Sequence, residues 1–389
     1  MTTMPAPRSF GCGATYTSRI SCLLACFWAI SPLLDGASFE HRHPGDFIFQ
    51  FAPALMIGFF SRALPRWAGQ PVSPRFALEA LAICSGITLI LRGIGNTNLQ
   101  IASAFITSAL ALVVCFQALT RRGRRIAYVA FLLALYACAA ILHAGAIMPT
   151  PRFGLGALIL LCSELGDRIC SAQLSAIAQD PIEPPRSSTF IVPLQVRRLT
   201  RLAAVAFWLL NDHVALSGGV ATLAGLSHLI GLRPWLSWRH SGVAILCLGV
   251  LWMQIGFAFL AASEYWPAAE ILAIHAWGVG GLGSLAAGII TSMVRRQLAQ
   301  PFSSSATTNL AYLSGTVAAC CRLIGATGLW NTDLFLWAAK LAWGCCFGLC
   351  GVFLLRAFAT SPIAVSDFHE PRSLETAAPE SFPPTTHGS

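Results

Sequence analysis

Basic residues placed within or at the ends of long apolar stretches are the residues of this sequence that could do chemistry. They are His43, His143, His213, His275, Arg92, Arg322 and Lys340. Ionisable side chains in such stretches are costly to bury and usually serve a function. Histidine nitrogen is a common ligand of haem iron, copper and zinc. Arginine or lysine nearby would pair with haem propionates or another anion. The set therefore predicts a cofactor site, provided that the fold brings these residues to one depth.

The composition places these residues in a membrane. Apolar residues make up 56% of the 389 residues and charged residues only 11%, whereas a soluble chain carries about 25% charged residues. Stretches of about 20 apolar residues, long enough to cross a bilayer, recur along the chain. Backbone groups must pair internally in lipid, so we expect an all-α membrane helix bundle. The twelve expected spans are 19–36, 46–64, 76–94, 99–119, 126–147, 153–178, 198–214, 216–233, 241–263, 268–292, 308–328 and 334–358.

The arginines give the bundle an orientation. The even-numbered loops and both chain ends hold nineteen of the 24 Arg residues, and the odd-numbered loops hold only Arg42, Arg92 and Arg152. Because positive loops favour the cytoplasm, both termini should be cytoplasmic and the seven candidate residues should lie in the outer half. This separation requires a helix break at residues 211–213, since one continuous helix over 199–232 would reverse every later loop.

The same arginine distribution explains the net charge of +9 without a nucleic-acid surface. Residues 1–360 are expected to form the transmembrane bundle. Residues 361–389 are rich in Pro, Ser, Thr and Glu, which predicts a disordered cytoplasmic tail.

Several polar residues also have plainer explanations. Histidines at helix ends commonly contact water or lipid headgroups, and the outer-facing His41 and His213 fit this explanation best. Glu164 and Arg168 are four residues apart, with Asp167 alongside. Their spacing predicts a buried ion pair, or alternatively part of a proton or ion path.

Three stretches, in this order along the chain, resemble motifs of the NnrS family. The first is HPGDFIFQFAPALMIGFFSRALPRWAG (43–69), similar to H-x-H-E-M-L-F-G-F … G-F-L-L-T-A-V-P-N-W-T-G. The second is LWMQIGFAF (251–259), similar to L-W-x-L-H-L-G-Y-A-W. The third is AIHAWGVGGLGSLAAGIITSMVRRQLAQP (273–301), similar to A-L-H-A-L-T-x-G-A-x-G-x-M-x-L-A-V-M-T-R … G-H-T-G-R-P.

The resemblance implies a multi-pass protein of the bacterial inner membrane that contains haem and copper. It also implies a role in nitric oxide metabolism and in protection against nitrosative stress. No catalysed reaction is attached to the family, so enzymatic activity stays open. The expected partners are the lipid bilayer and either nitric oxide or a redox partner, and no nucleic acid.

The resemblance further implies which residues hold the cofactors. The family's histidines fall on His43, His143 and His275, which are therefore the expected metal ligands. We expect haem between His143 and His275, because both lie about one helical turn from the outer face. Arg92 and Arg322 are expected at similar depth and would bind the two propionates. A haem held by two histidines suits electron transfer, and loss of one histidine would open a site for nitric oxide.

Several family positions have changed in this chain. Gly45, Asp46 and Phe47 replace the second His, the Glu and the Met of the first motif, and Gln254 and Gln297 replace two further histidines. Glycine offers no side-chain ligand and neutral glutamine is a poor one, so the sequence predicts haem more than copper. Two other interpretations stay open: a twelve-span secondary transporter, and a degenerate family member that has lost its metals.

Overall fold

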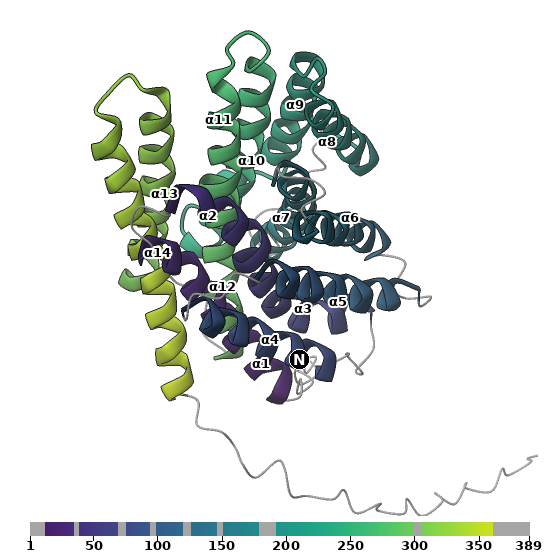
Figure 1. The fold of residues 1–389 in the computed structure, drawn as a ribbon, viewed down its shortest axis with the longest axis vertical. Helices are drawn as coiled ribbons and strands as arrows, with labels where there is room; N and C mark the ends of the chain where they lie inside the picture. The colour runs from purple at the N-terminus through teal and green to yellow at the C-terminus, as the bar shows by residue number, and fades with distance from the viewer. Residues whose placement is uncertain are drawn as a thin grey trace, which may run out of the picture.

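A computed structural model describes residues 12–34, 39–68, 75–93, 99–119, 126–145, 151–178, 192–298 and 305–360 (Figure 1). These residues form helices joined by short turns, with no strand among them. The expected tail 361–389 lies outside the described residues, as do the loop arginines Arg8, Arg121, Arg122, Arg124, Arg125, Arg186 and Arg372.

The helices follow one another along the whole described chain. They are α1 (Cys12–Ile30), α2 (Phe39–Asp46), α3 (Ala52–Ala68), α4 (Arg75–Gly93), α5 (Leu99–Leu119), α6 (Ala127–Ala144), α7 (Arg152–Ala178), α8 (Leu194–Leu209), α9 (Ala215–Gly231), α10 (Ser241–Ala262), α11 (Ala268–His275), α12 (Gly283–Gln297), α13 (Ala306–Thr327) and α14 (Thr332–Thr360). Single turns of 3-10 helix occupy η1 (Ser31–Leu34) and η5 (Pro234–Ser237).

Two pairs of these helices are continuous through a π-helical segment. The segment η3 (Phe47–Phe51) joins α2 to α3, and η6 (Ala276–Leu282) joins α11 to α12. With each pair counted as one, the described residues contain twelve helical segments, and each overlaps one expected span, although α1 already begins at Cys12 where the span was expected from residue 19. The predicted all-α fold class is confirmed.

Long apolar helices identify the chain as a multi-pass membrane protein. Within the described residues, seven helices are long and apolar enough to cross a bilayer: residues 43–67, 99–119, 127–144, 241–262, 268–295, 306–327 and 332–360. Along α5 the side chains of Ile101, Phe105, Leu112 and Phe116 are 64–70% exposed. They recur at helical spacing on one face, and such an apolar surface requires lipid rather than water. Crossing by all twelve segments, with cytoplasmic ends, stays a prediction.

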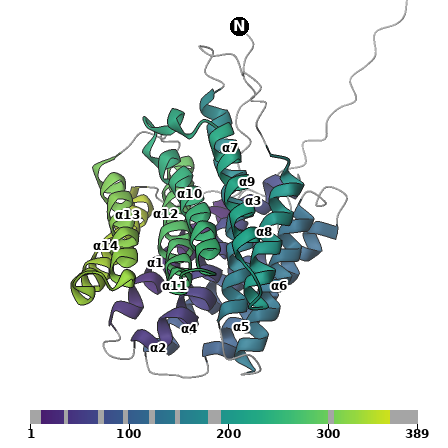
Figure 2. The same ribbon diagram turned by 90° about the horizontal axis from the view of Figure 1, so that it is seen from above.

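The helix α10 occupies the middle of the bundle. It packs against α7, α9, α11 and α12, while α13 lies along α14 and α5 lies along α6. Figure 1 shows the α13–α14 pair on one side of α10 and α11, and the α8–α9 pair on the other. The view from above in Figure 2 shows the same order. Residues on either side of α11 therefore come from distant parts of the sequence.

The expected helix break at residues 211–213 is confirmed. Helix α8 ends at Leu209, and Asn211 adopts a left-handed conformation with φ of 55°, which asparagine tolerates better than most residues. Glu264, in the turn after α10, accepts the Ala215 backbone N–H at 2.8 Å and lies 2.9 Å from Nδ1 of His213. These two interactions, the backbone hydrogen bond first, lower the pKa of the Glu264 carboxyl. His213 is 88% exposed at the side chain, consistent with a surface role.

Reporter fusions test the orientation predicted from the arginines. A cytoplasmic reporter is expected to be active, and a periplasmic reporter inactive, at both the 120–125 and the 295–300 loops. The physical reason is the retention of positive loops on the cytoplasmic side. A periplasmic signal from the second loop but not the first would contradict an even number of crossings between them.

Candidate cofactor site

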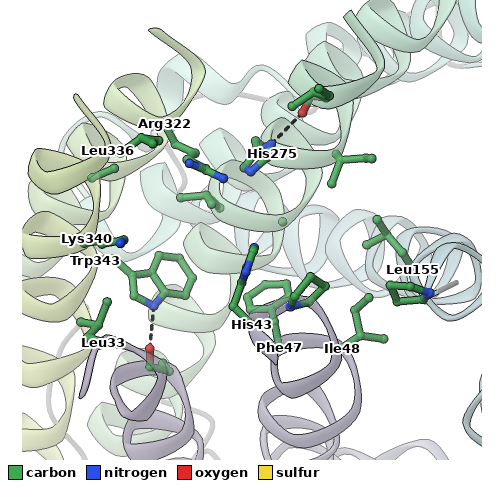
Figure 3. Close-up of a pocket in the computed structure, with 18 of the residues that line it drawn as sticks. Leu33, His43, Phe47, Ile48, Leu155, His275, Arg322, Leu336, Lys340 and Trp343 are labelled. Atoms are coloured by element: carbon green, nitrogen blue, oxygen red, sulfur yellow. Dashed lines mark hydrogen bonds between the residues drawn. The ribbon is translucent and has the colours of Figure 1, made fainter. Parts of the chain in front are cut away.

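A cavity of about 480 Å³ brings together four of the residues singled out in the sequence. His43 comes from α2, His275 from α11, Arg322 from α13 and Lys340 from α14, and Figure 3 shows them around one space. Pockets of roughly 300–1,000 Å³ hold small organic ligands and cofactors. The predicted convergence of distant basic residues on one site is thus present for these four.

Large apolar side chains form most of the cavity wall. The wall includes Trp28, Leu33, Phe47, Ile48, Leu155, Trp208, Ile271, Ile274, Val279, Leu336 and Trp343. Trp343 is fixed by its indole N–H, which donates to the backbone oxygen of Ala29 at 2.9 Å. Such a wall suits a flat apolar group and excludes water from its faces.

The imidazole of His275 has a defined orientation. Its Nδ1 lies 2.7 Å from the backbone oxygen of Ile271, one turn earlier in α11. Because a carbonyl oxygen can only accept, Nδ1 carries the hydrogen in a neutral ring and Nε2 keeps its lone pair. Histidines that bind metals commonly have this second hydrogen bond, which fixes the tautomer and the ring orientation. His275 is therefore prepared to ligate through Nε2.

Both cavity histidines lie within about one helical turn before a π-helical segment. His43 precedes η3 by four residues, and His275 is the residue before η6. Single π-helical turns within α-helices occur frequently at functional sites, because they redirect side chains. The sequence interpretation placed His43 before the span, whereas the helix already begins at Phe39. The polar residues of α2 hid this first part from a hydropathy criterion.

Basic side chains outnumber acidic ones in the described lining of the cavity. Arg152, Arg322, Lys340 and two histidines line it, and none of the described lining residues is acidic. Arg152 is paired with Glu270 at 2.8 Å and its guanidinium lies 4.8 Å from the centre of the Trp208 ring. The sequence interpretation did not include Arg152 in the site. Its position as one of only three outer-loop arginines was the available signal.

His143 lies outside this cavity, on the other side of η3. Its ring stacks on Phe49, with 4.7 Å between ring centres and 18° between planes, and it is not among the lining residues. A Cβ added to Gly45 would lie 3.6 Å from Nε2 of His143. His143 thus neighbours the position at which the family motif has its second histidine. The geometry does not place His143 opposite His275 across one cofactor.

Arg92 also lies behind the cavity wall. Its Nη1 is 2.9 Å from Oδ2 of Asp46, and its guanidinium carbon lies 5.6 Å from the centre of the Trp28 ring. Trp28 lines the cavity and Arg92 does not. The Arg92–Asp46 pair therefore joins α4 to the end of α2 and supports the helix that carries His43.

A metal bound by protein side chains alone has no preformed site in the described part of the chain. No three His, Cys, Asp or Glu side chains there come close enough together to hold an ion. Haem does not require such a group, because its porphyrin supplies four nitrogens and the protein adds one or two axial ligands. His43 and His275 can supply those ligands, so the residues present fit haem.

One family model matches nearly the entire length of the chain. The model, described as NnrS protein, matches residues 13–361. This range contains almost all described residues and every side chain of the cavity. No curated protein matches the chain.

Proposed function

This chain belongs to the NnrS family, and we propose that it binds haem in the cavity between His43 and His275 and protects bacteria against nitric oxide. The inner membrane is its proposed location. The convergence of two histidines and two cations on one apolar cavity is the observation that carries the proposal. No catalysed reaction is included.

His275 is the proposed first axial ligand. The hydrogen bond to Ile271 holds the ring and leaves Nε2 available, so little side-chain entropy would be lost on ligation. His43 is the proposed second ligand, because it lines the same cavity from the facing helix. This differs from the ligand pair expected from the sequence, in which His143 held the second position.

Arg322 and Lys340 are the proposed partners of the two propionates. Both line the cavity on the α13–α14 side, where charge-assisted hydrogen bonds to carboxylates would be strong. Arg152 pairs with Glu270 and its guanidinium stacks on Trp208, so its proposed role is to fix this part of the wall. Arg92 contacts Trp28 and Asp46 rather than the cavity, so its proposed role is to position the helix that carries His43.

Bound haem would supply an iron able to bind nitric oxide or to transfer electrons. The chain itself holds the imidazoles, excludes water with its aromatic wall and neutralises the propionates.

Copper is proposed at well below one ion per chain. Gly45 offers no ligand beside His143, and Gln254 is fully buried with its side-chain amide donating to the backbone oxygen of Val250. Elemental analysis of protein purified from copper-supplemented cells is expected to show substoichiometric copper. One tightly held copper per chain would show that other residues supply the ligands.

Growth under nitric oxide donors tests the proposed role. Cells that lack this gene and have no related gene should grow poorly with donors at low oxygen. Growth should return with the natural protein and with His240→Ala, whose residue lies at the opposite end of α10 from α11, but not with His275→Ala. Equal growth of the deletion strain and its parent at every donor concentration would remove the support for this role.

A further inference from the structure

A buried cluster of charges lies between α7 and α8, away from the cavity. Asp167 pairs with Arg197 and with Arg201, whose Nη1 is 2.8 Å from Oδ2. Glu164 pairs with Arg168 at 2.7 Å, which confirms the ion pair expected from their spacing, and it also pairs with Arg198. We call these six residues the arginine cluster.

The arginine cluster carries more positive than negative charge. The ion pairs among its described residues join two carboxylates to four guanidiniums, so the six residues carry two more positive than negative charges. Asp167, Arg197 and Arg201 are each at most 7% exposed at the side chain. A surplus of guanidinium groups over carboxylates favours an anion at this position.

The arginine cluster also contains hydrogen-bond donors without partners, which likewise indicates that it binds an anion. The Nε atoms of Arg197 and Arg201 are buried and have no hydrogen-bond partner in the described part of the chain. Both use their Nη atoms for Asp167, so the Nε–H groups remain. Burying an N–H donor without a partner destabilises the folded state unless a bound group accepts from it.

His228 of α9 adds a third unsatisfied group. It is 4% exposed, and neither ring nitrogen has a hydrogen-bond partner among the described residues. It lies within electrostatic range of Asp167, Arg197 and Arg201. A neutral imidazole always carries one N–H, so this side chain brings a further buried donor towards the same cluster.

We infer that the arginine cluster and His228 form a binding site for an oxyanion, the phosphate group being the chemistry that fits best. Excess positive charge excludes a cation, and unsatisfied N–H donors exclude an apolar ligand. The oxygens of a phosphate group are strong acceptors for donors of the kind that the Nε–H groups and His228 offer. Arg168 and Arg198, at 26% and 15% side-chain exposure, lie at the more accessible side of the cluster.

The site is separate from the proposed haem site. Arg152 at the start of α7 lines the cavity, and Asp167 follows fifteen residues later, about 22 Å along the helix. Under the predicted topology the arginine cluster lies in the cytoplasmic half. Basic pockets between helices on that side bind phosphate headgroups of anionic lipids, and free phosphate offers the same chemistry.

Two variants remove donors and should leave the fold intact. His228→Leu removes a side chain that has no partner in the described structure. Arg201→Gln removes one charge and one Nε–H, while Asp167 keeps Arg197. Arg239→Gln is the matched control, because it removes the same charge from a residue that stacks on Trp238 outside the cluster. All three variants should keep the haem absorbance of the natural protein, which checks that the substitutions leave the cavity unaltered.

Thermal unfolding of the purified protein, followed by tryptophan fluorescence, measures the binding. Sodium phosphate is titrated against sodium chloride at equal ionic strength in neutral detergent. A second arm compares phosphatidylcholine bilayers with and without phosphatidylglycerol. Specific binding raises the unfolding temperature in a saturable way. We expect half-saturation to need roughly tenfold more anion in His228→Leu and in Arg201→Gln, because each variant removes one hydrogen-bond donor to the anion; tenfold corresponds to about 1.4 kcal/mol.

Each outcome decides the inference. Stabilisation by inorganic phosphate that both variants weaken and Arg239→Gln preserves supports a free anion. Stabilisation by phosphatidylglycerol alone, with the same dependence on variants, supports a lipid headgroup at the same site. The inference would be overturned if neither phosphate nor phosphatidylglycerol raised the unfolding temperature of the natural protein. It would also be overturned if all three variants showed the same rise in unfolding temperature. Neither result depends on haem being bound.

Discussion

His275→Ala is expected to abolish the haem absorbance band of the purified protein. The substitution removes the imidazole whose Nε2 is available because Nδ1 is bound to Ile271. It leaves a small side chain on α11 and does not touch the cavity wall elsewhere, so the protein should still fold. Absorption spectra and haem content per chain, measured on matched preparations, give the result.

Three further histidine variants locate the second ligand. His43→Ala should shift the band or lower the haem content, because His43 lines the cavity. His143→Ala should change little, since His143 stacks on Phe49 outside the lining, and His240→Ala is the control. Loss of haem in His143→Ala with retention in His43→Ala would restore the ligand pair expected from the sequence.

Gly256→Ala is expected to destabilise the protein and to lower its haem content. A Cβ at Gly256 would lie 2.3 Å from Nε1 of Trp277. Trp277 is 1% exposed and donates to the backbone oxygen of Met253 at 3.1 Å. Overpacking of this kind costs about 1–3 kcal/mol, and loss of the buried hydrogen bond adds to it. Since Trp277 follows His275 by two residues, its displacement should also move the ligand.

Gly219→Ala is the matched control for this substitution. Gly219 also lies within a helix, α9, and nothing is within 4 Å of a Cβ placed there. Alanine favours a helix over glycine by about 1 kcal/mol, so the control should be as stable as the natural protein or more so. Thermal unfolding in detergent measures both variants. Equal unfolding temperatures for Gly256→Ala and Gly219→Ala would contradict the packing account.

The helices were predictable because their signal is local. Runs of about 20 apolar residues define a span wherever they occur, and the polar residues at Asn211 mark a break that the backbone confirms. The first turns of α2 were missed, since Phe39–Asp46 is polar. The π-helical segments η3 and η6 were not predictable, because a shifted hydrogen-bond pattern leaves no mark in composition.

The site was predictable only in part. The order of spans predicts how deep in the membrane a residue lies, but not which residues of other helices lie beside it. His43, His275, Arg322 and Lys340 were expected at one depth, and they line one cavity. His143 is expected at similar depth yet stacks on Phe49. Arg197 and Arg198 were assigned to the positive-loop signal, whereas they pair with Asp167 and Glu164 of α7. Which helices pack together depends on side-chain fit across distant segments, and no single stretch of sequence records it.

The haem content of the natural protein is the most direct test of whether the cavity between His43 and His275 binds haem. The protein is purified from haem-replete cells, and haem per chain is measured by the pyridine haemochrome method beside the visible spectrum. We expect a Soret band and about one haem per chain, since the cavity holds one pair of axial ligands. A colourless protein with intact helical structure from such cells would contradict it.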